Sequence, residues 1–407
     1  MSQQLVRSTS LAGAIVLGLG SILGTGAFVS VGIGADIAGG AVLWAILIAA
    51  VTALCNGLSS AQLASAHSVS GGTYEYGYRF LTPAYGVTAG SLFIVAKSAS
   101  AATAALAVGW YVTNVMAIPE YLAQWIAAAV LVLFTLLVLG GVKRTNWVNA
   151  AIVTVSIVAL LAFIITGHQQ TAVVVERASV EWWHVLQAAA LLFVAYTGYG
   201  RIATMGEEVQ NPRQVIPLTV ILTLAVVTLL YLGVGSALLH FPSIADFQAE
   251  HFSLASLLPT GPIQWLVAVG AVVAMGGVIL NLILGVSRVV LAMGRRADLP
   301  MRFANLNDQQ TSAPPATWLT CFVMLVLVAI GDIKTAWSFS AFTVLVYYGI
   351  TNLAALKVTK SDRFVPKWVS ILGLVSCLGL AVFVPWQVLL SGLIFIVVVL
   401  LIHQLRR

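Results

Sequence analysis

The chain has 407 residues, of which 60% are hydrophobic and only 8% are charged, and its formal net charge is +6. A soluble domain carries about 25% charged residues. This composition, with a mean hydropathy of +1.02, excludes a soluble protein and a membrane-tethered soluble enzyme. The basic excess is typical of the inner face of a polytopic membrane protein and does not indicate nucleic-acid binding. The three cysteines lie in apolar runs without metal-binding spacing, so we expect no metal site and no cofactor.

Apolar runs divided by polar or charged breaks predict an all-α integral membrane protein in which the first run is retained and not cleaved as a signal peptide. Each span needs about 20 apolar residues. The twelve predicted transmembrane helices lie near residues 10–37, 40–65, 83–118, 121–142, 146–167, 183–204, 215–240, 262–294, 314–331, 335–357, 366–384 and 386–404.

The placement of lysine and arginine predicts the orientation of these spans. An even number of spans puts both termini on one side. With both termini inside, all basic residues but Arg177, Lys334 and Lys97 lie in inner segments or within about two turns of an inner helix end. This bias predicts cytoplasmic termini. The nearly tail-free chain suggests the inner (cytoplasmic) membrane of a bacterium.

Lys97 differs from the other basic residues because it lies far from both ends of the third span. It follows Pro83 by 14 residues, or about 21 Å of helix, which is more than its side chain can span by snorkelling. An ionisable group at membrane depth is costly without a partner or a cavity, so it marks a functional site. Desolvation disfavours the charged amine, and Lys97 is our candidate for coupling proton movement to transport or for a fixed organising charge.

Two glycine clusters predict broken helices in spans 1 and 6. Span 1 contains GLGSILGTGAF (18–28) and span 6 contains FVAYTGYG (193–200). Unwound glycine segments expose N–H groups that bind anions and carbonyl groups that bind cations, as a zwitterion requires. The alternative is that each GxG is only a helix-packing contact. Spans 1 and 6 begin two blocks of five, and an odd number of spans gives the blocks opposite topology.

Four segments make the chain similar to a known family. GSILGTGAF, SGGTYEYGYRF, FVAYTGYGRIATMGEEVQNPRQVIP and SRVVLAMGRRADLP together resemble the amino acid–polyamine–organocation (APC) superfamily over about residues 10–357. The resemblance implies an amino acid or amine permease with a LeuT-like fold. In that fold a cytoplasmic tail (1–9) precedes a first five-helix repeat (10–167), an inverted second repeat (168–357) and two extra C-terminal helices (358–407), with helices 1 and 6 discontinuous.

The resemblance also implies where a substrate binds. Backbone N–H groups of the first break would hold the substrate carboxylate, and carbonyl groups of both breaks would hold its amine. Aromatic side chains in span 6 would act as an occluding gate, the alternative being ordinary packing. The implied binding residues are Ile22, Gly24, Thr25, Gly26, Phe193, Ala195, Tyr196 and Gly198.

Departures from the family pattern bear on the substrate and on coupling. Many members have an acidic residue where this chain has Gly200, so a neutral amino acid is favoured over arginine or a polyamine. Sodium-coupled relatives use span 8 hydroxyl groups, which are absent between Ile263 and Val286. Proton-coupled or sodium-independent relatives often carry a span 5 lysine, where this chain has Ser156. We therefore expect sodium-independent transport, by proton coupling or by exchange.

The inner end of span 6 carries Glu207 and Glu208 close to Arg213, which suggests an inner gate with an ordinary solvated loop as the alternative. Histidines at helix ends and the lack of paired carboxylates within a span argue against an enzyme, and the lack of a filter loop argues against a channel. An amino acid sensor and a cationic amino acid or polyamine exchanger remain alternatives. The expected partners are an amino acid and the lipid bilayer, with the oligomeric state left open.

Overall fold

The computed structural model describes residues 10–67, 71–141, 146–170, 181–203, 211–241, 253–307, 312–330 and 332–405. These residues form helices and connecting loops, and no strand occurs among them. Lipid offers no hydrogen-bond partners to a backbone, so a chain this apolar pairs its N–H and C=O groups within helices.

Nine helical segments of the described part are long and apolar enough to cross a membrane, and three shorter apolar helices accompany them. The chain is therefore a multi-pass membrane protein, while the count of twelve spans stays a prediction. In chain order the helices are α1 (Leu11–Ile22), η1 (Gly26–Ser30), α2 (Val31–Ala38), η2 (Gly39–Ala41), α3 (Val42–Ala66), α4 (Thr73–Phe80), α5 (Pro83–Met116), α6 (Leu122–Leu139), α7 (Asn146–His168), α8 (Trp182–Tyr196), η3 (Thr197–Tyr199), α9 (Gly200–Ala203), α10 (Pro212–Leu238), η6 (Leu254–Leu257), α11 (Pro262–Arg295), η7 (Met301–Ala304), α12 (Pro314–Ile330), α13 (Ile333–Leu356), α14 (Lys367–Ala381) and α15 (Trp386–Leu405).

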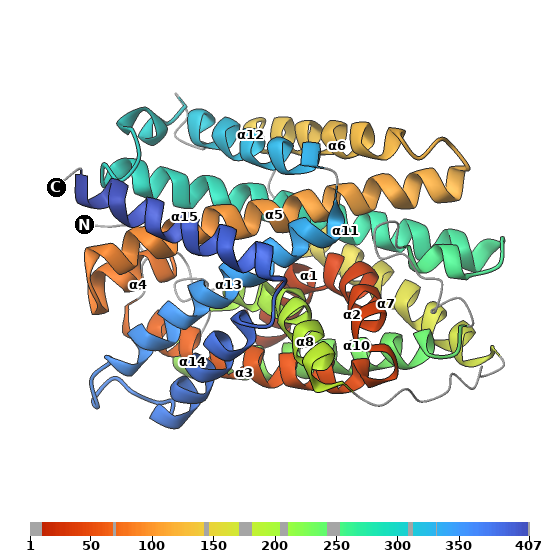
Figure 1. The fold of residues 1–407 in the computed structure, drawn as a ribbon, viewed down its shortest axis with the longest axis horizontal. Coiled ribbons are helices and arrows are strands. Elements are labelled where there is room, and N and C mark those ends of the chain that lie inside the picture. Colours follow the sequence, from red (N-terminus) through yellow and green to blue (C-terminus); the bar gives the residue numbers. More distant parts are fainter. Residues whose placement is uncertain are drawn as a thin grey trace.

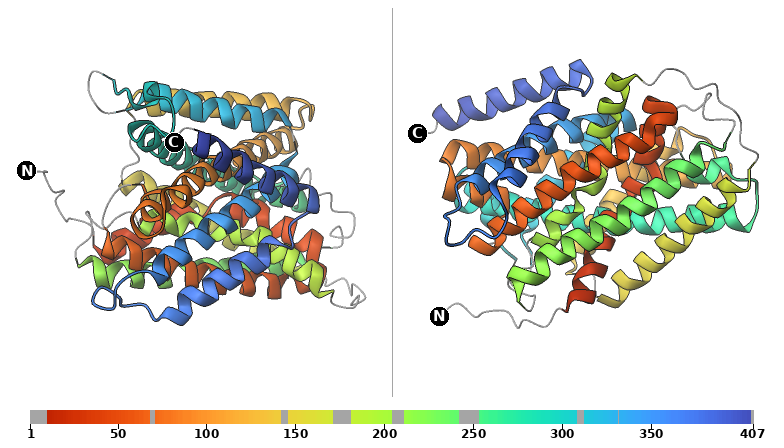
Figure 2. Two further views of the ribbon diagram at one scale, coloured as in Figure 1. Left: turned by 60° about the vertical axis from the view of Figure 1, so that its left-hand side comes forward. Right: turned by 90° about the horizontal axis from the view of Figure 1, so that it is seen from below.

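The helices form a bundle whose central elements are the broken ones. α6 and α12 lie side by side along one edge, next to α5 and α11 (Figures 1 and 2). α3, α10 and α14 lie on the opposite side of the bundle (Figure 1). α1, α2 and α8 lie between these layers, where α1 contacts α7, α10 and α11, and α8 contacts α2, α3 and α13.

The long helix α5 brings a polar residue to the centre of this bundle. Its middle, Ala96–Leu106, consists mainly of alanine with a few hydroxyl residues and is fully or almost fully buried. Small side chains let helices approach closely in a membrane, where packing and not water exclusion drives association. α5 therefore packs tightly against α11 and α13 and carries Lys97 into the interior.

Among the described α-helices, α4 is the one that the sequence analysis does not predict. α4 lies in the loop between α3 and α5, at the same end of the bundle as the C-terminal end of α15 (Figure 1). The motif TYEYGYRF, on which part of the family resemblance depends, forms this helix.

Candidate functional site

The first break interrupts a regular helix after Ile22. Leu23 has an extended conformation, and α-helical geometry is replaced over Gly26–Ser30 by a wider π-helical turn before α2 begins. The Phe28 N–H donates to the Gly24 carbonyl (3.1 Å), so hydrogen bonding resumes across the break. The carboxyl end of α1 and the amino end of the next helical segment thus face each other in mid-span.

The second break follows Tyr196. α8 ends there, a 3₁₀ turn covers Thr197–Tyr199, and the short helix α9 begins at Gly200. The Thr197 hydroxyl donates to the Val194 carbonyl (2.8 Å), which satisfies one of the carbonyl groups released at the end of α8.

Glycine is required at these breaks because the two backbones touch. A Cβ atom on Gly198 would overlap the carbonyl of Ser21, and one on Gly26 would overlap Ala195 and the Tyr231 hydroxyl. The glycine clusters therefore allow the backbones of spans 1 and 6 to approach closely, and they also allow each helix to be interrupted.

A small cavity lies where the two breaks meet. The space in it that a water-sized sphere can occupy is about 50 Å³, which is small beside a typical small-molecule pocket. Its lining combines backbone, hydroxyl groups, apolar side chains and one charged side chain. The lining residues are Ser21, Ile22, Thr25, Gly26, Lys97, Ser100, Val194, Ala195, Thr197, Gly198, Val278, Leu282 and Trp337.

Lys97 lies at the wall of this cavity and is 7% exposed. Its ammonium group donates to the Thr197 hydroxyl at 2.8 Å. Thr197 is the residue that caps the carboxyl end of α8, and the partial negative charge of a helix carboxyl end favours a cation. Within the part of the chain that the structure describes, no aspartate or glutamate lines the cavity.

Two further hydroxyl groups of the lining differ in their partners. The Thr25 hydroxyl is buried and has no hydrogen-bond partner within the described residues. Ser100 hydrogen-bonds to Ser340 (2.8 Å), whose hydroxyl also contacts the Ala96 carbonyl (2.9 Å). Thr25 is thus the hydroxyl that a bound molecule would satisfy.

Three of the predicted binding residues do not line the cavity. Gly24 packs against Val278, Phe193 packs edge-on against the Tyr348 ring, and the Tyr196 ring lies tilted against that of Tyr231. Phe193 and Tyr196 are fully buried. The other five, Ile22, Thr25, Gly26, Ala195 and Gly198, meet at the cavity with Lys97.

Sequence reasoning missed several side chains that hold the breaks in place. The Tyr231 hydroxyl donates to the Ala195 carbonyl (3.0 Å), and the Tyr348 hydroxyl donates to the Thr197 carbonyl (3.3 Å). Trp337 lines the cavity and donates its indole N–H to the Leu191 carbonyl (3.0 Å). Nothing in one sequence pairs these aromatic residues with span 6, whereas Thr197 could have been found from its place beside Gly198.

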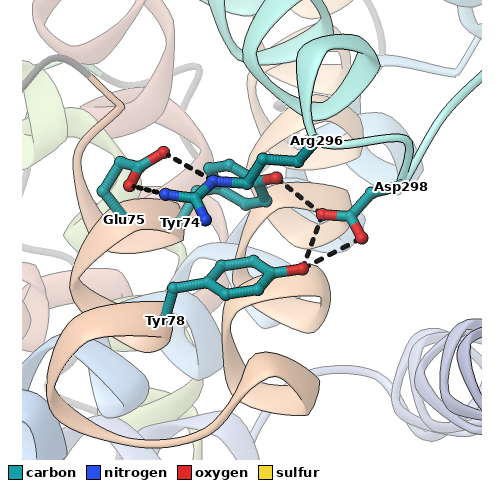
Figure 3. Close-up of polar contacts among 5 residues, drawn as sticks. All are labelled: Tyr74, Glu75, Tyr78, Arg296 and Asp298. Carbon is teal, nitrogen blue, oxygen red and sulfur yellow. Dashed lines mark hydrogen bonds and ion pairs between the residues drawn. The ribbon is translucent and has the colours of Figure 1, made fainter. Parts of the chain in front are cut away.

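A second polar cluster ties α4 to the end of α11 (Figure 3). The Arg296 guanidinium donates to both carboxylate oxygens of Glu75, at 3.2 and 2.5 Å, and lies over the Tyr78 ring. The Tyr74 and Tyr78 hydroxyls donate to Asp298 at 2.6 and 2.7 Å. The hydrogen bond to Glu75 raises the pKa of Arg296. Burial and the hydrogen bonds to Asp298 raise the pKa of both tyrosines, which remain donors.

The predicted inner gate falls partly outside this description. Glu207 and Glu208 lie outside the described residues, and Arg213 is exposed near the start of α10. Arg296, directly after α11, pairs with Glu75.

Comparison with known proteins agrees with this architecture. Residues 10–403 match the family described as amino acid permease. An uncharacterized transporter of Mycobacterium tuberculosis is 36% identical over 99% of this chain and 92% of its own length. A branched-chain amino acid permease of Bacillus subtilis is 25% identical (96% and 90%), and a methylthioribose transporter of the same species is 27% identical (99% and 94%). These relatives are transporters and not enzymes, and the chain belongs to the amino acid permease family.

Proposed function

We propose that the protein is a secondary active transporter that moves neutral amino acids across the cytoplasmic membrane by alternating access. The observation that carries the proposal is the cavity between two broken helices, lined by backbone, hydroxyl groups and apolar side chains. Opposed helix ends at one place suit a zwitterion, because the amino end attracts its carboxylate and the carboxyl end its ammonium.

The arrangement of repeats is part of the same proposal. Broken helices at the first and sixth positions fit two five-helix repeats of opposite topology (10–167 and 168–357), followed by two extra helices. Alternating access then consists of movement of the broken helices relative to the surrounding ones. Both termini are cytoplasmic in this scheme, which rests on the distribution of basic residues.

Sodium independence is supported at the wall formed by α11. Val278 and Leu282 line the cavity where sodium-coupled relatives supply hydroxyl groups, and Val278 packs against Gly24. A hard cation requires about six oxygen ligands, which these hydrocarbon side chains do not provide. On α7, the Ser156 hydroxyl donates to the Ile152 carbonyl of its own helix (2.7 Å).

Lys97 is the proposed coupling residue. It reaches the cavity and its hydrogen-bond partner belongs to the second break, so gain or loss of its proton would act on a segment that has to move. Exchange without ion coupling is the competing mechanism, and a fixed organising charge is the competing role.

The function is tested with purified protein in two steps. A thermal-shift screen against the twenty amino acids identifies substrates, because a ligand that binds the native state stabilises it. Counterflow of the labelled amino acid in proteoliposomes then demonstrates transport. Stabilisation only by arginine or polyamines would overturn the neutral-substrate proposal, and binding without counterflow would indicate a sensor.

Coupling is tested with the Lys97→Gln variant in the same vesicles. Proton coupling predicts that the variant loses accumulation driven by a pH gradient but retains counterflow, in which no net ion movement is needed. Unchanged gradient-driven accumulation would contradict the coupling role of Lys97.

A further inference from the structure

Lys97 also bears on which substrates the cavity can bind, through its charge and not through proton movement. The side chain is the one charged group among the lining residues, and its nitrogen lies 2.8 Å from the Thr197 hydroxyl. Two features of the described structure face this nitrogen. Thr197 accepts a hydrogen bond from it, and both α1 and α8 end at the cavity with their partially negative carboxyl ends.

A positively charged Lys97 ammonium at the cavity wall repels any second cation that enters the cavity. The Lys97 ammonium occupies the carboxyl end of α8, which leaves the carboxyl end of α1 for the α-ammonium group of an amino acid and no helix end for a second cation. Nearby carbonyls have donors too, since Thr197 donates to Val194 and Tyr231 donates to Ala195. Among the described residues, no carboxylate lines the cavity to compensate a further positive charge.

We propose that Lys97 is the charge-selecting residue of the cavity, which admits neutral and anionic side chains and rejects substrates with a second ammonium or guanidinium group. The proposal rests on the proposed amino acid transport and deepens it. Two like charges about 6 Å apart in a protein interior of moderate effective dielectric constant repel by an amount that corresponds to about a hundredfold change in affinity. That is sufficient to separate otherwise similar substrates.

The test compares L-norleucine with L-lysine, which share a linear side chain and differ in the terminal ammonium group. Both are measured by thermal shift and as competitors of labelled neutral amino acid in counterflow without a pH gradient. In the wild-type protein we expect lysine to compete at least about tenfold more weakly than norleucine.

Four variants separate charge from other roles of the side chain. Ser100→Asp keeps Lys97 and adds a compensating carboxylate at another lining position, so it should reduce the preference for norleucine to about threefold or less. Lys97→Gln should reduce the preference similarly, and Lys97→Glu should reverse it in favour of lysine. Ser100→Asn, which is matched in size and uncharged, should leave the wild-type preference in place.

The outcomes distinguish the two proposals. If neither norleucine nor any other amino acid stabilises the wild-type protein, the proposed function fails. If norleucine binds and lysine binds equally well, or if Ser100→Asp and Lys97→Glu retain the wild-type preference, charge selection by Lys97 is overturned while amino acid transport stands. If the variants at one of the two positions do not fold, those at the other position still give the test, because Ser100→Asp and Lys97→Glu both change the net charge of the cavity.

Discussion

Thr25 is an unusual residue at the cavity because its hydroxyl is buried without a partner in the described structure. The residue is 3% exposed and follows Gly24 in the first break. A buried hydroxyl without a hydrogen bond costs about 1–3 kcal/mol. A side chain that carries this cost at a cavity wall is explained by a ligand that accepts or donates the missing bond.

Removal of the Thr25 hydroxyl should therefore raise the stability of the ligand-free protein and lower its affinity for substrate. Thr25→Val keeps the shape and removes the hydroxyl, so the ligand-free protein should gain about 1 kcal/mol in unfolding free energy. The same variant should bind the substrate about tenfold more weakly, since a lost hydrogen bond of this kind is worth about 1.4 kcal/mol. Thermal shifts with and without amino acid measure both, and Thr25→Ser is the control that keeps the hydroxyl. Loss of stability in Thr25→Val without loss of binding would contradict the ligand role.

The site residues that can be predicted from the sequence are those that are unusual in a membrane helix. Lys97 was singled out because a charge in mid-span has no ordinary explanation, and glycines 24, 26 and 198 because they interrupt helices. Tyr231 and Trp337 were missed, because an aromatic residue in a membrane helix is unremarkable until the fold brings it to a particular carbonyl.

At the scale of elements, α4 illustrates a helix that tertiary contacts stabilise. It has eight residues, which is shorter than an isolated helix requires in water. Its hydrogen bonds and ion pair to Arg296 and Asp298 supply the anchoring that its length does not (Figure 3). The sequence analysis treated this stretch as a loop because local pattern alone does not reveal such partners.

Removal of the Asp298 carboxylate should release α4. Asp298→Ala deletes the acceptor of the Tyr74 and Tyr78 hydroxyls, and hydrogen bonds to a charged group contribute about 1.5–3 kcal/mol. We expect amide hydrogen exchange in α4 to become at least about tenfold faster, while exchange in α15 is unchanged. Asp298→Asn retains one acceptor oxygen and should lie between the variant and the wild type. Equal exchange in all three proteins would mean that the hydrogen bonds to Asp298 do not hold α4 in place.

At the scale of the whole molecule, the sequence predicts which stretches form the long helices better than it predicts how these helices are arranged. Long apolar runs have to form helices in lipid, so each predicted range contains one, including the interrupted ranges 10–37 and 183–204. The placement of α6 beside α12 at one edge has no signature in a single sequence, because lipid-facing and protein-facing apolar surfaces look alike (Figure 1). The family is known from similarity to other proteins, and the proposed mechanism is based on the cavity between the two breaks.

The proposed alternating access requires that contacts across the ends of the bundle break and form again, and Asp36–Lys334 is a candidate for such a contact. It joins the end of α2, the helix beyond the first break, to the start of α13 at 3.1 Å. The two side chains are 23% and 40% exposed, so water screens the pair and its contribution is at most about 1 kcal/mol. Such a contact can bias the equilibrium between closed and open states by up to about fivefold without locking the protein.

Neutralisation of this pair should favour opening at the α2–α13 end. We expect Lys334→Gln to raise the rate at which a thiol reagent labels a Ser100→Cys probe in the cavity by about two- to fivefold. The native cysteines of the described structure are buried and give a low background. Lys334→Arg, which keeps the charge, should label like the parent, and so should the exchanged pair Asp36→Lys with Lys334→Asp. Labelling that is equal in Lys334→Gln and the parent, or an exchanged pair that behaves like Lys334→Gln, would show that this ion pair has no part in the transition.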